Sequence, residues 1–332
     1  MDPLENRSIL ITGGTGSFGK TFVRHVLANH KVKRLVVYSR DELKQFEMAN
    51  EIKAPNLRYF LGDVRDVGRL ERALKGIDIV VHAAAMKQVV ASEYNPIECI
   101  MTNVMGAENV INAAINAGVK RVVALSTDKA VNPINLYGAS KLCSDKLFIA
   151  ANHIGGAQGC RFSVVRYGNV LGSRGSVVPV FRKQMKSGTL QITDPRMTRF
   201  WLTVDQGVRF VIQSLELMIG GEVFVPKIPS MRIVDLATAI APDCRQEVVG
   251  IRPGEKLHEI MIPVDESRQT LEFDDFYVIQ ASFHMWDGGQ VLRYPGRAGK
   301  AVPDDFAYTS NGNTQWVSHD DLRTMIATGA AG

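Results

Sequence analysis

Short apolar runs alternate with longer amphipathic segments through the first half of the chain. Nearly continuous apolar runs of four to eight residues are typical of parallel strands that are covered on both faces. The runs expected to form strands are 8–11, 34–38, 58–61, 77–82, 121–125 and 161–167. Helical patterns separate them, as in 20–29 and 96–117. Strands that alternate with helices in this way predict a doubly wound, parallel α/β sheet.

The pattern changes after residue 170. Expected helices at 178–186, 204–219 and 234–240 are mixed with a strand at 222–226 and a basic, aromatic stretch at 191–201. We expect a smaller C-terminal α/β lobe that binds substrate. The expected division is a nucleotide-binding domain at 1–170 to which 204–219 returns, a substrate-binding lobe at 171–280 and a C-terminal arm at 281–332. The arm would cover the site or mediate assembly.

A glycine-rich turn joins the first strand to the first helix. Gly13, Gly16 and Gly19 form a G-x-x-G-x-x-G pattern. Glycines at such a turn let the backbone approach a pyrophosphate, which then lies at the positive end of the helix. With the strand before it and the helix after it, the pattern predicts a Rossmann-type dinucleotide site. The expected contacts are Gly13, Thr15, Gly16, Ser17, Phe18 and Gly19.

The residues after the second strand favour NADP over NAD. A cation there accommodates a 2′-phosphate, whereas an acid binds the free ribose hydroxyl. An alternative reading is that Arg40 only pairs with the adjacent acid. The residues expected around the phosphate are Ser39, Arg40, Asp41, Glu42 and Lys44.

Three more strand ends carry candidate ligand residues. Asp63, followed by Val64, could accept from the adenine amino group or instead cap the helix that starts at 67. Ala83 begins a run of small residues that lets the chain pass close to a ligand, and Lys87 would project over the cleft. The alternative for Lys87 is a solvated loop lysine. Polar residues also follow the sixth strand.

The segment after the fifth strand carries the candidate chemistry. Thr127, Asp128 and Lys129 leave the strand, and a helix then presents Tyr137 and Lys141 one turn apart on one face. A phenol titrates near pH ~10, and a neighbouring cation together with an oxidised nicotinamide would lower that pKa. The pattern predicts a tyrosine acid/base. Taken alone, the tyrosine and lysine could equally be incidental residues of a surface helix.

Composition narrows the possible functions. The chain of 332 residues has a formal net charge of +5 and no long lysine or arginine run, which suits an anionic small molecule and does not imply nucleic acid. Its four cysteines are scattered, which predicts reduced thiols and neither a disulfide framework nor a metal site. No apolar run approaches the ~20 residues of a membrane span. We expect a soluble, cytoplasmic protein.

Taken together, these motifs resemble the extended short-chain dehydrogenase/reductase family, in particular its nucleotide-sugar members with a C-terminal substrate lobe. The resemblance is densest to the configuration-inverting UDP-N-acetylglucosamine 4,6-dehydratases. The stretches that carry it are Thr12–Gly19, Tyr38–Glu47, Ala83–Lys87, Ser126–Ala130, Asn132–Gly138, Arg166–Val170, Met197–Trp201, Phe224–Ser230, Gly250–Glu259 and Tyr308–Trp316. One departure is Gln88, where the family usually has histidine.

The resemblance implies a reaction in which C4 of the hexose is oxidised by NADP⁺, a proton leaves C5, water leaves C6 and hydride returns to C6. Tyr137 would take the C4 hydroxyl proton, Lys141 would tune it, and Thr127 would bind the C4 oxygen. Lys129 would be the C5 base and Asp128 the acid, although the two roles could be exchanged. Retaining relatives have Asp-Glu at this pair.

A lysine base must be neutral. We expect burial, Lys141 and the nicotinamide charge to lower the pKa of Lys129, with ionised Asp128 opposing them. Plain ion pairing of Asp128 with Lys129 is the alternative, which we weigh against because adjacent residues of an extended segment usually point apart.

The resemblance also implies the remaining contacts. The expected cofactor residues further include Tyr137, Lys141 and Val170, and those expected to hold UDP-N-acetylglucosamine are Lys87, Asn169, Arg174, Arg199, Arg252 and Glu255. Arginines suit the pyrophosphate because they bind it with two donors. The resemblance implies a homo-oligomer, from a dimer to a hexamer, and the first step of pseudaminic acid synthesis for surface glycans or flagellin.

Two other readings stay open. A C4 epimerase or a retaining dehydratase would use the same frame, but an epimerase has no use for an Asp-Lys pair. A non-catalytic NADP-sensing protein would need neither Tyr137 nor Lys141.

Overall fold

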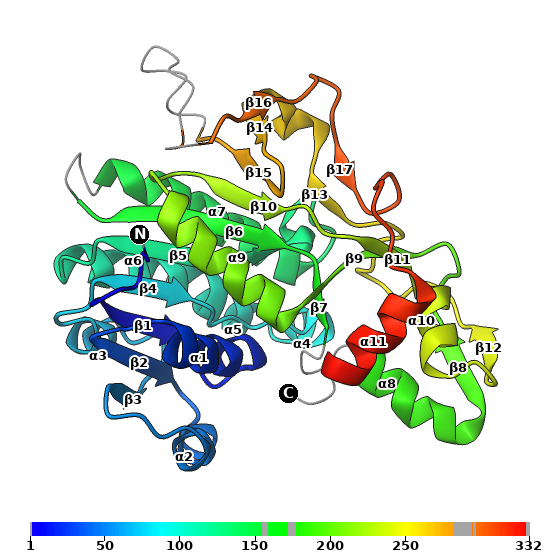
Figure 1. Cartoon of the computed structure of the whole chain (residues 1–332), viewed down its shortest axis with the longest axis horizontal. Coiled ribbons are helices and arrows are strands. Elements are labelled where there is room, and N and C mark those ends of the chain that lie inside the picture. Colours follow the sequence, from blue (N-terminus) through cyan, green and yellow to red (C-terminus); the bar gives the residue numbers. More distant parts are fainter. Residues whose placement is uncertain (1, 155–158, 172–176, 282–293, 295–296, 330–332) are drawn as a thin grey trace.

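The computed structural model describes residues 2–154, 159–171, 177–281, 294 and 297–329. A large sheet runs through the molecule, with helices on both of its faces (Figure 1). Within the described ranges, no helix is both long and apolar enough to cross a membrane.

The large sheet has ten strands in the order β16-β14-β15-β10-β6-β5-β4-β1-β2-β3. The pairs from β3 through β10 are parallel, and β15, β14 and β16 are added antiparallel at the far edge. The order 3-2-1-4-5-6 confirms the Rossmann-type prediction. The strands are β1 (Ser8–Thr12), β2 (Arg34–Ser39), β3 (Leu57–Leu61), β4 (Ile79–His82), β5 (Arg121–Thr127), β6 (Arg161–Tyr167), β10 (Val223–Pro226), β14 (Thr270–Glu272), β15 (Phe276–Ile279) and β16 (Lys300–Ala301).

Helices cover both faces because the central strands are buried on both sides. Every residue of β1 and β4 is buried, so their apolar side chains need partners above and below the sheet. On one face α1 (Ser17–Asn29) packs against α9 (Val204–Leu217). On the other, α3 (Val67–Ala73), α6 (Gly106–Asn116) and α7 (Leu136–Ile154) lie side by side. The short elements that complete this part are α2 (Glu42–Glu51), α4 (Val89–Tyr94), α5 (Pro96–Ile100), the π-helical turn η1 (Met101–Met105) and the 3₁₀ turns η2 (Asp128–Ala130) and η4 (Val264–Gln269).

A second group of elements has its own apolar core. This core includes Leu171, Phe181, Trp201, Met231 and Leu322. Figure 1 shows the red helix α11 beside α8 and α10 in this group. Its elements are β7 (Asn169–Leu171), α8 (Val177–Gln184), η3 (Met185–Ser187), β8 (Thr189–Ile192), β9 (Thr198–Thr203), β11 (Ser230–Arg232), α10 (Ile233–Ile240), β12 (Arg245–Val248) and α11 (His319–Gly329). The antiparallel pair of β13 (Ile260–Ile262) and β17 (Tyr308–Thr309) lies between the two groups in sequence and in space.

The large sheet crosses the domain boundaries expected from sequence. β10, β14 and β15 come from the range 171–280 yet extend the sheet built by 1–170, and α9 packs on that sheet. The described parts of the arm are divided as well, since β16 joins the large sheet and α11 packs on α10. The sequence could not show this because antiparallel additions at a sheet edge leave no local signal. The domain limits themselves stay a prediction.

We predict that the arm stabilises the second core. Leu322 of α11 is fully buried in that core, whereas the neighbouring Arg323 is exposed. Leu322→Ala should lower the free energy of unfolding by about 2–5 kcal/mol because it leaves a cavity. Arg323→Ala on the same helix should change it by less than about 0.5 kcal/mol. Urea denaturation measures both, and equal stability of the two variants would contradict the prediction.

Candidate active site

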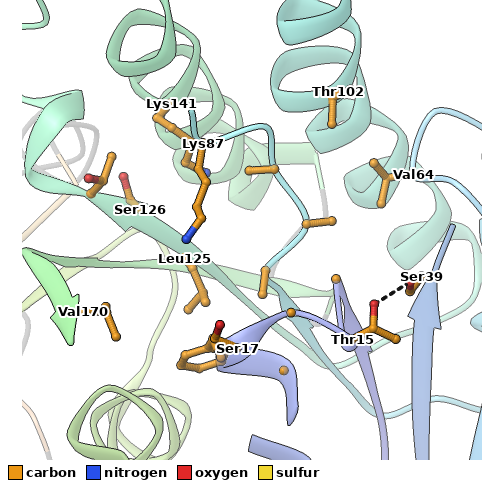
Figure 2. Close-up of a pocket in the computed structure, with 18 of the residues that line it drawn as sticks. Thr15, Ser17, Ser39, Val64, Lys87, Thr102, Leu125, Ser126, Lys141 and Val170 are labelled. Atoms are coloured by element: carbon orange, nitrogen blue, oxygen red, sulfur yellow. Dashed lines mark hydrogen bonds between the residues drawn. The ribbon is translucent and has the colours of Figure 1, made fainter. Parts of the chain in front are cut away.

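A cavity of about 540 Å³ lies at the carboxyl ends of the parallel strands. In an open parallel sheet ligands bind at this edge, where the strand order reverses. Figure 2 shows Lys87 reaching into the cavity from the loop after β4, over the strand that carries Leu125 and Ser126. We call it the first cavity. Of the expected cofactor residues, it is lined by Gly13, Thr15, Gly16, Ser17, Phe18, Gly19, Ser39, Arg40, Asp41, Lys44, Asp63, Val64, Ala83, Lys87, Tyr137, Lys141 and Val170.

Glycine is required at the turn of the first cavity. Gly13 has φ of +64°, and a Cβ there would lie 2.9 Å from the backbone of Ala84. At Gly19 a Cβ would lie 2.4 Å from the backbone of Gly14. The turn therefore packs tightly against the loop after β4 and leaves its own backbone facing the cavity. This is the surface that a pyrophosphate at the start of α1 needs.

The residues after β2 are arranged around the start of a helix that sequence reasoning missed. Asp41 caps α2 by accepting from the Lys44 amide at 3.0 Å, and its carboxylate also pairs with the Lys44 ammonium. Arg40 lies 3.6 Å from Asp63. Thr15 and Ser39 share a hydrogen bond of 2.8 Å (Figure 2). Glu42 is not brought to the cavity, because it begins α2 with its side chain exposed.

The helix-cap reading of Asp63 is wrong. Asp66 caps α3 by accepting from the Arg69 amide at 2.9 Å, while Asp63 pairs with Arg65 at 2.8 Å. Its carboxylate lines the first cavity. A contact between Asp63 and adenine stays a prediction.

A second cavity of about 350 Å³ adjoins the first and shares Lys87, Lys129, Asn169 and Val170 with it. It lies between the loop after β4 and the second group of elements. Of the expected substrate residues, it is lined by Lys87, Asn169, Arg199, Arg252 and Glu255. Arg174 lies outside the described residues. The two adjoining cavities thus bring the residues expected to bind the cofactor close to those expected to bind the substrate, although most of the two sets lie far apart in the sequence.

Lys129 lies where the two cavities meet. Its ammonium is 3.0 Å from Asp128 and 3.2 Å from Glu259, so the ion pair that we weighed against is present. Adjacent side chains meet here because the strand ends at Thr127 and the chain turns at once into η2. Asp128 is fully buried behind Lys129 and does not line either cavity. Thr127, Tyr137 and Lys141 line the first cavity with Lys129.

The charges around Lys129 act on its pKa in the direction opposite to the one expected from the sequence. Burial acts to lower the pKa of Lys129, but Asp128 and Glu259 outweigh it, so that pKa lies above the ordinary lysine value. In the polypeptide alone the expected lowering is therefore outweighed, because Asp128 pairs with Lys129 and Glu259, which is far away in sequence, adds a second negative charge. Burial raises the pKa of Asp128, and Glu259 adds to this, while Lys129 opposes it.

The tyrosine and its lysine are also governed by burial. Burial raises the pKa of Tyr137 to about 12, although Lys129 and a hydrogen bond with Thr127 act to lower it. Burial lowers the pKa of Lys141, with Asp145 opposing. The polypeptide alone therefore does not lower the pKa of Tyr137 as expected from the sequence.

Sequence reasoning missed Glu259 as a member of the site. It is 2% exposed, lines the second cavity and approaches both Lys129 and Arg199. In the sequence, Glu259 is only the last residue of Gly250–Glu259, one of the stretches that carry the family resemblance. Nothing in that stretch marks Glu259 as a site residue in preference to any other glutamate of the chain. Within the described ranges, no group of three or more histidine, cysteine, aspartate or glutamate side chains is placed to hold a metal ion.

The fold and this site are those of a nucleotide-sugar enzyme of the extended short-chain dehydrogenase/reductase class. Residues 9–281 match the family described as "Polysaccharide biosynthesis protein". The chain belongs to this family.

Two curated relatives cover almost the whole chain. The inverting UDP-N-acetylglucosamine 4,6-dehydratase of Campylobacter jejuni subsp. jejuni serotype O:2 is 55% identical, over 96% of this chain and 97% of that protein. A UDP-glucose 4-epimerase of Rickettsia conorii is 39% identical, over 97% of this chain and 96% of that protein.

Solved structures agree on the fold. The structure of Pen from Bacillus thuringiensis superposes with a TM-score of 0.89 at 36% identity, covering 98% of both chains. The dTDP-glucose 4,6-dehydratase DesIV from Streptomyces venezuelae, solved with NAD and TYD bound, superposes with a TM-score of 0.68 at 27% identity. It covers 75% of this chain and 86% of its own. The second of these proteins thus binds a nicotinamide cofactor on the shared fold.

We predict that the close packing at Gly13 is needed for dinucleotide binding. Gly13 and Gly188 both have positive φ, at +64° and +74°, but only Gly13 would place a Cβ against backbone. Alanine at either position should cost about 1–2 kcal/mol of stability through the left-handed conformation. Only Gly13→Ala should also lose affinity for NADP, as measured by calorimetric titration. Equal NADP affinity of the two variants would count against a dinucleotide at this turn.

Proposed function

We propose that this chain is a UDP-N-acetylglucosamine 4,6-dehydratase that inverts C5. Its product would be UDP-2-acetamido-2,6-dideoxy-β-L-arabino-hexos-4-ulose. The observation that carries the proposal is the Asp128–Lys129 pair beside Tyr137, at the junction of two adjoining cavities. The 55% identity to the Campylobacter protein of that name supports both the substrate and the inversion.

The cofactor in this proposal is NADP, held in the first cavity. The fit rests on the glycine turn, where a Cβ at Gly13 or Gly19 would fill space against backbone. Ser39 and Arg40 favour a 2′-phosphate, because a guanidinium pairs well with one. When bound, NADP⁺ would supply the oxidising capacity for C4 and, once reduced, the hydride for C6.

Tyr137 is the proposed base for the C4 hydroxyl. Its pKa near 12 must fall before it can act at neutral pH, and a positive nicotinamide ring beside it would lower it. Thr127 reaches the same part of the cavity and donates to a carboxylate oxygen of Asp128 at 2.9 Å. That hydroxyl can turn to the developing C4 oxygen. Lys141 is buried and lines the same cavity, where it would add a positive charge.

The Asp128–Lys129 pair handles the protons of the elimination. The C4 ketone acidifies the C5 proton, and Lys129 is the member of the pair that reaches the cavities. Transfer of a proton across the 3.0 Å contact turns the ion pair into an amine and a carboxylic acid without changing the net charge. The amine can then take the C5 proton, and the proton on Asp128 can be relayed to the leaving C6 hydroxyl. The two groups would titrate as one coupled unit.

UDP-N-acetylglucosamine would occupy the second cavity, with its hexose at the junction. Arg252 is exposed and lies 4.0 Å from Glu255, so its guanidinium can turn toward a pyrophosphate. Lys87 and Asn169 line both cavities and can contact the sugar. Arg174 stays a prediction from sequence, as do the pseudaminic acid pathway, the cytoplasmic location and an assembly of dimers into a hexamer.

The similarity to an epimerase makes C4 epimerisation the second candidate. Epimerisation would use Tyr137 and the cofactor in the same way. Epimerisation has no use for a lysine held beside a buried aspartate. A non-catalytic sensor would need neither that pair nor Tyr137. The pair therefore favours dehydration.

We predict that the purified protein converts UDP-N-acetylglucosamine in deuterium oxide without added nicotinamide. Proton NMR should show a new C6 methyl signal and deuterium at C5, since the C5 proton exchanges with solvent. After chemical reduction of the 4-keto product, the H4–H5 coupling constant should show that the configuration at C5 is inverted. UDP-N-acetylgalactosamine as the only product would instead establish an epimerase.

Lys129→Met should reduce the rate of C5 proton exchange by a factor of about 10²–10⁴, the usual contribution of a general base. NADP binding should persist in the variant, because the cofactor contacts of the glycine turn are untouched. The matched control is Lys227→Met, which removes an ion pair with Glu272 at 2.8 Å, outside the residues that line the two cavities. Normal C5 exchange in Lys129→Met would contradict its proposed role.

Cofactor choice is tested at Arg40. Arg40→Ala should weaken NADP binding about tenfold, the loss expected for one exposed charge-assisted contact, and leave NAD binding unchanged. Arg58→Ala, an exposed arginine near the start of β3, is the control. Equal losses for NADP and NAD would show that Arg40 does not read the 2′-phosphate.

A further inference from the structure

Glu259 is a buried carboxylate whose partners are all at the reacting end of the site. One carboxylate oxygen lies 3.2 Å from the Lys129 ammonium and 3.8 Å from the Arg199 guanidinium. The other oxygen has no hydrogen-bond partner within the described residues, although the side chain is only 2% exposed. Because a buried oxygen without a partner is costly, its retention beside a cavity calls for a reason.

The backbone of Glu259 is held by the C-terminal arm. Its amide donates to the Ser310 hydroxyl at 2.9 Å, and its carbonyl accepts from the Ser310 amide at 2.8 Å. Ser310 follows β17, which pairs with β13 next to Glu259. The Ser310 hydroxyl also contacts the Thr198 hydroxyl at 2.6 Å. The carboxylate therefore projects toward Lys129 from a backbone that is tied on both sides.

The charges that face Glu259 come from three elements. Lys129 and Asp128 belong to η2, Arg199 to β9, and Lys256 to the loop before Glu259 itself. Burial acts to raise the pKa of Glu259, but Lys129, Arg199 and Lys256 outweigh it, so that pKa lies below the ordinary value. Glu259 is thus a carboxylate at neutral pH, and the Lys129 ammonium lies between two negative groups.

We propose that Glu259 is a positioning residue for the dehydration: it anchors the Lys129 ammonium at the junction of the cavities and sets the pH at which Lys129 gives up its proton. This inference rests on the proposed function for its catalytic meaning. The contact itself does not depend on the substrate.

Lys129 has to be a stable ammonium in the resting protein and a base during the reaction. With Glu259 ionised, the favoured resting form is the Lys129 ammonium beside the Asp128 carboxylate. The proton can cross the 3.0 Å contact to Asp128 once the C4 ketone has made the C5 proton acidic, and at that stage the cofactor would be reduced and its nicotinamide ring uncharged. Because no nicotinamide charge then acts on Lys129, the charges of Asp128 and Glu259 set how readily it gives up its proton.

The experiment is competitive acetylation of lysines in the whole protein, without substrate, read by peptide mass spectrometry as a function of pH. Only the neutral amine reacts, so the midpoint of the Lys129 labelling curve gives its pKa. Glu259→Gln removes one negative charge, which lowers that pKa. Labelling of Lys129 at a fixed pH should rise about tenfold for each unit of lowering. Glu259→Asp keeps the charge and should restore most of the wild-type curve.

The matched control is Glu272→Gln, the same change in a carboxylate that pairs with Lys227 at 2.8 Å. It should leave the Lys129 curve unchanged. A Glu259→Gln curve that coincides with wild type, or that moves to higher pH, overturns the proposal. If Glu259→Gln does not fold, the wild-type curve decides: in protein freed of nicotinamide cofactor, a Lys129 midpoint below that of ordinary lysines overturns the proposal.

Catalysis supplies the second readout. In Glu259→Gln the limb of the pH–rate profile that reports Lys129 should move to lower pH, and kcat should change more than KM. A change in KM with an unmoved profile would make Glu259 a substrate contact and overturn the positioning role. A wild-type protein that does not dehydrate UDP-N-acetylglucosamine, but whose labelling responds to Glu259 as expected, would refute the proposed function and leave the contact standing.

Discussion

The site depends on a lysine ammonium held between two carboxylates that come from different parts of the fold. Asp128 follows β5 of the large sheet, whereas Glu259 precedes β13 and is tied to the C-terminal arm. Removing a charge from water is expensive, and the two carboxylates that reach the same nitrogen offset part of that cost. Loss of the lysine would leave both carboxylates without their shared partner, so the cluster ties the segment before β13 to the end of β5.

This arrangement gives the buried groups separate tasks. Lys129 faces both cavities, Asp128 lies behind it as a proton partner, and Glu259 sets the balance between them. Tyr137 is kept neutral by burial until positive charge arrives beside it. The protein therefore holds its proton-handling groups in their inactive forms, and the charge of an oxidised cofactor would activate the tyrosine for the first step. Lys129 acts only after the cofactor is reduced, which suits a reaction whose oxidation must precede its elimination.

Local patterns predicted most of the fold and much of the site. The strand runs and the glycine turn depend on neighbouring residues only, so the order β1 to β6 followed from them. All the expected cofactor residues except Glu42 line the first cavity. What failed depends on residues distant in sequence. The antiparallel edge strands and the contact from Glu259 to Lys129 join segments that no periodicity connects. In the polypeptide alone the pKa of Lys129 is raised by Asp128 and by this unforeseen contact with Glu259.

The most direct test of the account follows a label within the substrate. UDP-N-acetylglucosamine carrying deuterium at C4 would be converted in ordinary water with the protein in large excess over any free nicotinamide. The account predicts that the deuterium appears in the C6 methyl group of the 4-keto product, because the hydrogen removed from C4 is the one returned to C6. Deuterium that stays at C4 of an epimerised sugar, or that is lost to solvent, would contradict it.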